Sequence, residues 1–163
     1  MSEQTSSGVM AGKRGLIMGV ANDRSIGWGI ASKLAEHGAE LAFTFQGEAL
    51  KKRVIPLAES VGSNLVLPCD VTDEASVDAV FDRLKSEWGK LDFVLHAIAY
   101  SDKEELKGGY VDTSRDNFQR TMDISVYSFT EITRKATAMM KDGGSLLTLT
   151  YYGAERVLSL IHI

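Results

Sequence analysis

Short apolar runs alternate along the chain with longer segments in which apolar residues recur every three or four positions. Each run is six to ten residues of mostly apolar character, bounded by glycine, proline or charge, and predicts a β-strand. The runs are residues 14–19, 40–45, 64–71, 91–99 and 143–152. The longer segments have the spacing of amphipathic helices; they are residues 28–38, 48–60, 73–89 and 115–140.

Alternation of strands and helices predicts an α/β fold in which a parallel sheet carries helices on both faces. Right-handed crossovers make the doubly wound, Rossmann-type strand order the expected one. The runs at 14–19 and 64–71 are nearly all apolar, so we expect both strands to be buried on both faces.

The first candidate site lies between Gly19 and Gly27. Gly19 ends the first predicted strand, and a helix is expected to begin near Ser25. Ligands of a doubly wound sheet bind at the carboxyl ends of its strands, where a helix N-terminus offers unpaired N–H groups to phosphate. The spacing G-x5-S-x-G is neither G-x-G-x-x-G nor a P-loop, so the pattern by itself is equally typical of simple packing.

Further candidate ligand-binding residues stand at the ends of the second, third and fourth predicted strands. Gln46 follows the second strand, where dinucleotide-binding folds often have an acid for the ribose hydroxyls. Asp70 follows the third strand and can accept a hydrogen bond from an adenine amino group. Ala97 and Ala99 follow the fourth and leave room for a ribose and a nicotinamide. Together they favour a dinucleotide site.

Composition narrows the class of protein. The 163 residues suit one domain, and 44% of them are hydrophobic, which is enough for a packed core. A net charge of -4 disfavours a nucleic-acid partner. The apolar runs are too short to cross a membrane, and the N-terminus lacks a secretory signal. With one cysteine, Cys69, and no metal-ligand spacing, we expect a cytoplasmic protein without disulfide or metal.

Read in order, six motifs resemble one family. They are G-x5-S-x-G at 19–27, ELAFTFQ at 40–46, CDV at 69–71, HAIAYSD at 96–102, DISVYSF at 123–129 and LLTLTYYGAERV at 146–157. Their order and spacing are similar to those of the NADH-dependent enoyl-acyl-carrier-protein reductases of bacterial type II fatty-acid synthesis. These enzymes are a divergent branch of the short-chain dehydrogenase/reductases. The similarity spans residues 12–157 and implies reduction of the trans-2 double bond of an enoyl thioester carried by acyl carrier protein.

The resemblance also implies site residues, which extend those that the strand ends suggest. It places a cofactor against Gly19, Ala21, Ser25, Ile26, Gln46, Asp70, Val71, Ala97, Ile98 and Ala99. Tyr100 and Ser101 would open the substrate loop, and Tyr151 would be catalytic, as the first of two tyrosines that face the thioester.

The implied cofactor is NADH. Because Gln46 is uncharged, the usual repulsion of a 2′-phosphate is absent, and Lys51, Lys52 and Arg53 follow closely. NADPH is therefore the less favoured alternative.

The resemblance divides the chain into a flexible arm at 1–12, an incomplete Rossmann domain at 13–157 and a non-family tail at 158–163. The family's second tyrosine would fall at Ile161, and its lysine, later strands and later helices beyond the last residue. We therefore expect a truncated, inactive form. Family members commonly form homotetramers, whereas this chain should be poorly soluble because its fifth strand would present an unpaired edge.

Two other readings stay open. One is a ketoacyl-type short-chain reductase, although HAIA and TYYGAER replace the N-N-A-G pattern and the catalytic serine that such an enzyme would have at these positions. The other is a non-catalytic NAD-binding fragment. His96 ends a buried strand and is expected to be a core residue, as is Cys69.

Overall fold

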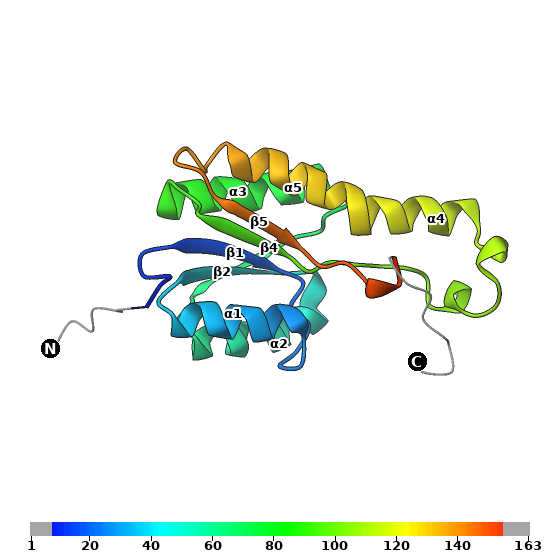
Figure 1. The fold of residues 1–163 in the computed structure, drawn as a ribbon, viewed down its shortest axis with the longest axis horizontal. Coiled ribbons are helices and arrows are strands. Elements are labelled where there is room, and N and C mark those ends of the chain that lie inside the picture. Colours follow the sequence, from blue (N-terminus) through cyan, green and yellow to red (C-terminus); the bar gives the residue numbers. More distant parts are fainter. Residues whose placement is uncertain (1–7, 155–163) are drawn as a thin grey trace, which may run out of the picture.

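The computed structural model describes residues 8–154 and contains one parallel sheet of five strands in the order β3-β2-β1-β4-β5 (Figure 1). The strands are β1 (Arg14–Met18), β2 (Glu40–Phe45), β3 (Leu65–Pro68), β4 (Phe93–His96) and β5 (Ser145–Thr148). All neighbouring strands pair in parallel. The order reverses between β1 and β4, so the predicted doubly wound α/β fold is confirmed.

Five α-helices cover the sheet: α1 (Ile26–Glu36), α2 (Gly47–Ser60), α3 (Glu74–Trp88), α4 (Arg115–Met122) and α5 (Ser128–Thr137). Helices α1 and α2 lie on one face, and α3 and α5 on the other, while α4 runs on past the end of the sheet (Figure 1). Short turns follow β4 and β5, namely η1 (Glu104–Leu106), η2 (Tyr110–Asp112) and η4 (Tyr152–Ala154).

The core has two layers because successive residues of a strand point to opposite faces. On the face of α3 and α5, Leu16 and Met18 of β1 join the apolar side chains of these helices. On the other face, Ile17 joins those of α1 and α2. The expectation that β1 is buried on both faces is thus confirmed. For β3 it is wrong: its residues are half-buried or exposed, since β3 lies at an edge of the sheet.

The helix predicted over 115–140 is present but is interrupted. A π-helical turn, η3 (Asp123–Tyr127), joins α4 to α5. Such turns insert an extra residue into the helical repeat, re-aim neighbouring side chains and are frequent at functional sites. The last strand is also shorter than predicted because its partner β4 ends at His96, which pairs with Thr148.

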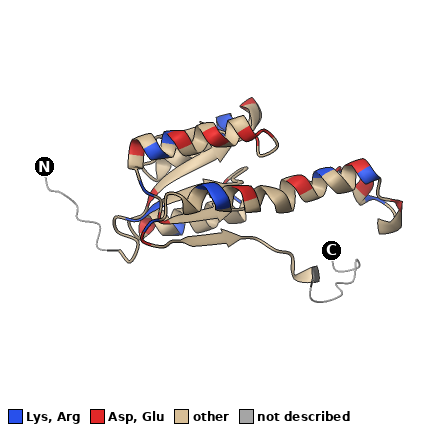
Figure 2. Cartoon of the chain, turned by 90° about the horizontal axis from the view of Figure 1, so that it is seen from above, with Lys and Arg blue, Asp and Glu red and all other residues tan. Residues whose placement is uncertain are grey.

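At the N-terminal side, residues 8–12 of the predicted flexible arm form a turn, in which the Met10 N–H donates to the His37 carbonyl at 3.0 Å. The rest of that arm and the tail predicted at 158–163 lie outside the described residues. Positive and negative side chains are mixed along the helices, and the strands carry few of either (Figure 2). Of the helices in the described part, none is long and apolar enough to cross a membrane.

Candidate functional site

A crevice of about 230 Å³ lies at the carboxyl ends of β1, β2, β3 and β4. Nine predicted site residues line it: Gly19, Ala21, Gln46, Asp70, Val71, Ala97, Ile98, Ala99 and Tyr100. Six lining residues were missed, namely Val20, Thr44, Phe45, Leu50, Cys69 and Ile124. Thr44, Phe45 and Cys69 could have been found from their places at strand ends. Ile124 could not, because it enters the site through the π-helical turn.

The floor of the crevice is backbone from two strand ends. Gly19 has a φ of 91°, and a Cβ built on it would lie 2.0 Å from the Ala97 carbonyl oxygen. Beside it, the Ala97 N–H donates to the Met18 carbonyl at 3.0 Å. Only glycine fits this contact, since the position demands both a left-handed backbone and the absence of a side chain.

Ser25 braces the loop that follows β1. Its Oγ accepts hydrogen bonds from the N–H groups of Ala21 and Asn22, each at 3.0 Å. Its side chain makes no capping bond to α1, so the first N–H groups of this helix have no side-chain partner from Ser25. Ser25 and Ile26 do not line the cavity itself, but they flank its loop, and Ile26 is 67% exposed. An exposed isoleucine here leaves apolar surface that a ligand can cover.

Gln46 and Asp70 join the ends of β2 and β3. Gln46 Nε2 donates to Asp70 Oδ2 at 2.9 Å. The other carboxylate oxygen, Oδ1, accepts from the N–H and the hydroxyl of Thr72 at 2.9 and 2.7 Å. The Thr72 N–H lowers the pKa of Asp70 most, followed by its hydroxyl, and the Gln46 amide contributes further against the opposing effect of burial. Asp70 is therefore an ionised acceptor at neutral pH.

The loop after β4 is held by the helix that contains the π-helical turn. Ser125 Oγ accepts from the Tyr100 N–H at 3.0 Å and donates to the Tyr100 carbonyl at 3.2 Å. Asn117 of α4 accepts from the Asp102 N–H at 2.9 Å and donates to Ser101 Oγ at 3.2 Å. Ser101, predicted to meet substrate, is thus turned toward α4 and does not line the crevice.

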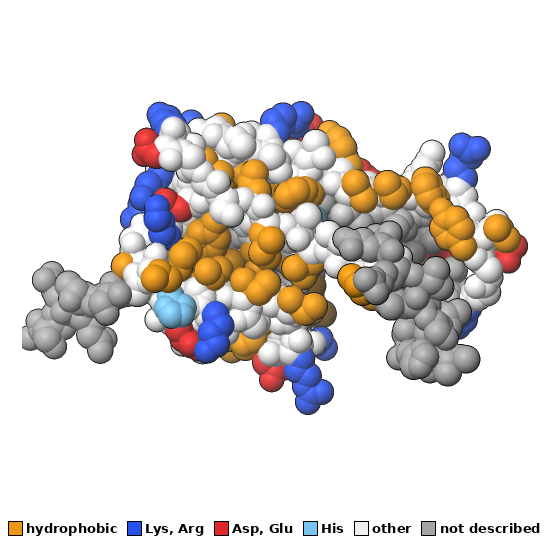
Figure 3. All heavy atoms as spheres, in the orientation of Figure 1, with side chains coloured by type: hydrophobic (Ala, Val, Ile, Leu, Met, Phe, Trp, Pro, Cys, Tyr) orange, Lys and Arg blue, Asp and Glu red, His pale blue; other side chains and the backbone are white. Residues whose placement is uncertain are grey.

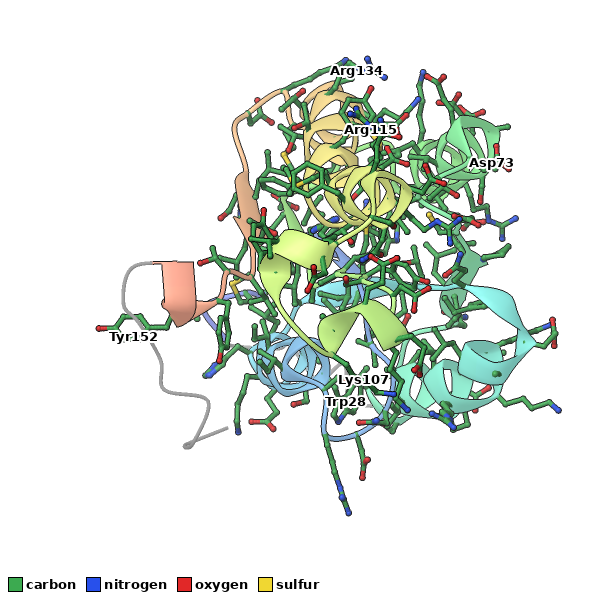
Figure 4. The ribbon with its side chains drawn as sticks, turned by 90° about the vertical axis from the view of Figure 1, so that its right-hand side faces the viewer. Trp28, Asp73, Lys107, Arg115, Arg134 and Tyr152 are labelled. Atoms are coloured by element: carbon green, nitrogen blue, oxygen red, sulfur yellow. The ribbon has the colours of Figure 1, made fainter. Side chains whose placement is uncertain are left out.

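Tyr151, the predicted catalytic residue, follows β5 and is 64% exposed. It is not among the residues that line the crevice. Its neighbour Tyr152 projects away from the sheet (Figure 4). The structure therefore gathers the predicted cofactor residues but not the predicted catalytic tyrosine, whose role stays a prediction.

Cys69 and His96 have surroundings typical of packing residues. Burial, with added effects of the Asp70 and Glu131 carboxylates, raises the pKa of the Cys69 thiol to about 12, so it stays protonated. His96 is fully buried, with Nε2 2.8 Å from Ser128 Oγ. Within residues 8–154, no three His, Cys, Asp or Glu side chains are placed to bind a metal ion.

Trp28 leaves the crevice open. It lies on α1, and its ring centroid is 6.2 Å from that of Phe43 in the core. It is half-buried there and does not line the cavity. The site is accordingly a nucleotide-sized hollow of backbone, small side chains and one oriented amide–carboxylate pair.

Comparison with known proteins agrees with this geometry. The family model described as enoyl-(acyl carrier protein) reductase matches residues 19–162. The curated enoyl-acyl-carrier-protein reductase (NADH) 1 of Rhizobium meliloti is 67% identical over 153 residues, which are 94% of this chain and 56% of that protein. The crystal structure of the Anaplasma phagocytophilum enoyl-acyl-carrier-protein reductase in complex with NAD has a TM-score of 0.90 and 58% identity, over 93% of this chain and 58% of that one.

The crystal structure of FabI from Candidatus Liberibacter asiaticus is equally similar in fold, with a TM-score of 0.90 and 56% identity. It is matched over 93% of this chain and 58% of its own. The chain thus spans somewhat more than half of the length of the relatives that it matches.

Proposed function

Because the chain belongs to the enoyl-(acyl carrier protein) reductase family, we propose that its crevice binds NADH and serves reduction of the trans-2 double bond of enoyl thioesters on acyl carrier protein. One observation carries the proposal: four strand ends, with Gly19 against the Ala97 carbonyl, form a single hollow beside the start of α1. A doubly wound sheet binds its nucleotide at this edge.

Each part of the crevice has a proposed task. The loop of Gly19, Ala21, Ser25 and Ile26 would hold the pyrophosphate, since N–H groups at the start of a helix attract anions. Gln46 would contact the adenosine ribose, and Asp70 and Val71 the adenine. The small side chains of Ala97 and Ala99, on either side of Ile98, would leave backbone accessible to the nicotinamide ribose. When bound, NADH supplies the hydride.

The residues beyond β4 and β5 are proposed to meet the substrate. Tyr100 and Ser101 would open the substrate loop, and Tyr151 would face the thioester oxygen as the first of two tyrosines, of which the second is the one that donates the hydrogen bond. Negative charge develops on that oxygen when hydride adds to the β-carbon, and a preorganised donor stabilises it. The acyl carrier protein, a homotetrameric assembly and a cytoplasmic location stay predictions.

Binding is tested by titrating the purified chain with NADH in a calorimeter. We expect saturable binding at one site per chain. Ala21→Glu places a carboxylate in the pyrophosphate loop and should weaken NADH binding by tenfold or more, on the order of 1.4 kcal/mol. Ala11→Glu adds the same charge to an exposed turn before β1 and should have no effect. Equal loss in both variants, or no binding by the parent chain, would contradict the proposal.

Turnover is a separate measurement. We expect a chain of these 163 residues to bind NADH without oxidising it in the presence of an enoyl thioester, because the second tyrosine implied by the resemblance falls at Ile161. Oxidation at the rate of a full-length relative would refute this expectation. Oxidation with a ketoacyl thioester instead would favour the ketoacyl-type alternative, and binding without either reaction agrees with a non-catalytic fragment.

A further inference from the structure

We propose that Asp70 fixes the orientation of the Gln46 side-chain amide, and that this orientation makes the ribose end of the crevice select a 2′-hydroxyl over a 2′-phosphate. The inference rests on the proposed function, because it assumes that a nicotinamide coenzyme occupies the crevice. It goes further by assigning the selectivity to a hydrogen bond between two protein side chains.

The first step is the direction of the bond between the two side chains. An ionised carboxylate accepts hydrogen bonds and cannot donate them. Both donors of Thr72 occupy Asp70 Oδ1, and Oδ2 is left facing Gln46 at 2.9 Å. The group of Gln46 that faces Asp70 must therefore be its NH₂. Donor and acceptor chemistry alone therefore assigns the nitrogen and the oxygen of the Gln46 amide.

The second step is what Gln46 then offers to a ligand. One N–H of its NH₂ bonds to Asp70, which turns Oε1 to the side away from Asp70, where this acceptor can meet the ribose. Gln46 ends β2 and lines the crevice, at the position where dinucleotide folds often use a carboxylate to accept from the ribose hydroxyls. An amide oxygen accepts from a 2′-hydroxyl in the same way. A 2′-phosphate offers mainly acceptors, so the two groups would repel each other.

The Asp70 carboxylate also repels a 2′-phosphate, but the nearby cations do not favour the same outcome. Lys51, Lys52 and Arg53 lie one turn into α2 and would attract a 2′-phosphate. Lys51 is already paired, with its Nζ 3.1 Å from Glu48 Oε1, and both Lys52 and Arg53 are exposed and screened by solvent. The orientation of one amide therefore decides between the coenzymes, and reversing it should expose the attraction of these cations.

Asp70→Asn should reverse the orientation of the Gln46 side-chain amide. The two Thr72 donors hold the carboxamide oxygen of the new side chain on their side, which leaves its NH₂ facing Gln46. Gln46 must then turn over, so that its oxygen accepts this bond and its NH₂ meets the ribose. An NH₂ donates to phosphate. The variant should therefore gain NADPH affinity relative to NADH.

The readout is the ratio of the Kd for NADPH to the Kd for NADH, measured by calorimetry. Both coenzymes carry the same adenine, so any lost contact between Asp70 and adenine cancels in the ratio. We expect the ratio to fall at least tenfold in Asp70→Asn. In a Gln46→Leu background, Asp70→Asn removes the same negative charge but turns no amide, so the ratio should fall much less than in Asp70→Asn alone. Thr72→Val is the matched control: it removes one bond to Asp70 but keeps the bond from Gln46, and should also preserve the ratio.

Each result has a definite meaning. An unchanged ratio in folded Asp70→Asn overturns the inference, and so does a variant that folds but binds neither coenzyme, which would make Asp70 a general binding residue. If Asp70→Asn does not fold, Asp70→Ser decides, because it frees Gln46 to turn and should lower the ratio less steeply. Failure of the parent chain to bind NADH overturns the proposed function instead.

Discussion

Two regions of the chain differ in how much of their apolar surface is exposed to solvent. Residues 14–99, the nucleotide half, contain β1 to β4 and most of the lining of the crevice. Residues 100–152, the distal half, contain α4, α5, β5 and the loops around them. Of fourteen large apolar side chains that are exposed among the described residues, twelve belong to the distal half, from Tyr100 onward. Figure 3 shows apolar side chains open to solvent along the helix that begins with α4.

The difference follows from position in the sheet. A central strand such as β1 has a strand on each side and helices over each face, so Leu16, Ile17 and Met18 are fully buried. Strand β5 is an edge of the sheet, and Leu147 and Leu149 on or beside it are 48% and 40% exposed. The nucleotide half therefore buries its apolar strands with the help of α5, which covers one face of β1, while much of the distal half presents apolar surface that further contacts can cover.

The strongest test of this contrast is Gly19→Ala, at the centre of the nucleotide half. The new Cβ would meet the Ala97 carbonyl oxygen and force a left-handed alanine. We expect the free energy of unfolding to fall by about 3 kcal/mol or more, and NADH binding to be lost. Thermal unfolding followed by circular dichroism, with calorimetric titration, measures both.

Gly29→Ala is the control for that substitution. Gly29 lies within α1, and a Cβ there would meet nothing within 4 Å. Alanine in a helix interior is better than glycine, so stability should rise by about 0.5–1 kcal/mol. If the two variants lose the same stability, the close contact of the strand ends is not what demands Gly19.

A second test concerns the exposed edge in the distal half. Leu147→Lys puts a charge on the open face of β5, and lysine on an edge strand opposes edge-to-edge association. We expect more soluble protein in light-scattering measurements and a stability change within about 0.5 kcal/mol. Leu146 packs against the core on the other face, so Leu146→Lys should cost about 2–3 kcal/mol. Unchanged aggregation of Leu147→Lys would show that the edge does not govern solubility.

The two halves also differ in how well the sequence predicts them. Strand order and five of the nine predicted lining residues follow from apolar runs and from what stands at their ends, because strand ends of a parallel sheet meet at one edge. The other four, Ala21, Val71, Ile98 and Tyr100, were implied by the family resemblance. The π-helical turn could not be predicted. The periodic pattern of apolar residues continues through residues 115–137. The π-helical turn that directs Ile124 into the crevice and Ser125 toward Tyr100 does not change the spacing of these residues.

The pattern of apolar and polar residues also does not predict how individual side chains are oriented. The phosphate contact of Ser25 stays a prediction, but the pattern did not show that its Oγ accepts from two N–H groups of its own loop. The substrate contact of Ser101 also stays a prediction, and the pattern did not show its bond to Asn117. Such local bonds compete with ligand contacts and depend on loop geometry that residue types do not specify.

His96 links the two halves and gives a pH test. Burial lowers its pKa from the ordinary value of 6.5, so the unfolded chain binds a proton more readily than the folded one. The free energy of unfolding should be highest well above pH 6.5 and fall as the pH drops through this value. His96→Gln should lower stability at every pH but flatten the change in Tm between about pH 8 and about pH 5.5. An equally steep change in the variant would assign the pH dependence to other groups.

The most local effect expected is at the junction of the halves, where Ser125 bonds both the N–H and the carbonyl of Tyr100 at 3.0 and 3.2 Å. Ser125→Ala removes both bonds at a partly exposed site, so the loss should be about 1 kcal/mol. It should appear as roughly fivefold faster exchange of the Tyr100 amide hydrogen, with little change in Tm.

Ser60→Ala is the matched control for this last variant, because Ser60 Oγ donates to the Leu57 carbonyl on exposed α2, far along the chain from the crevice. Ser60→Ala should leave the exchange of the Tyr100 amide hydrogen unchanged.

If Ser125→Ala also leaves this exchange unchanged, the π-helical turn does not hold the loop after β4, and that loop is held through Asn117 instead. If exchange rises at both Tyr100 and Asp102, the two anchors act as one unit, and a double variant with Asn117→Ala should show less than additive loss.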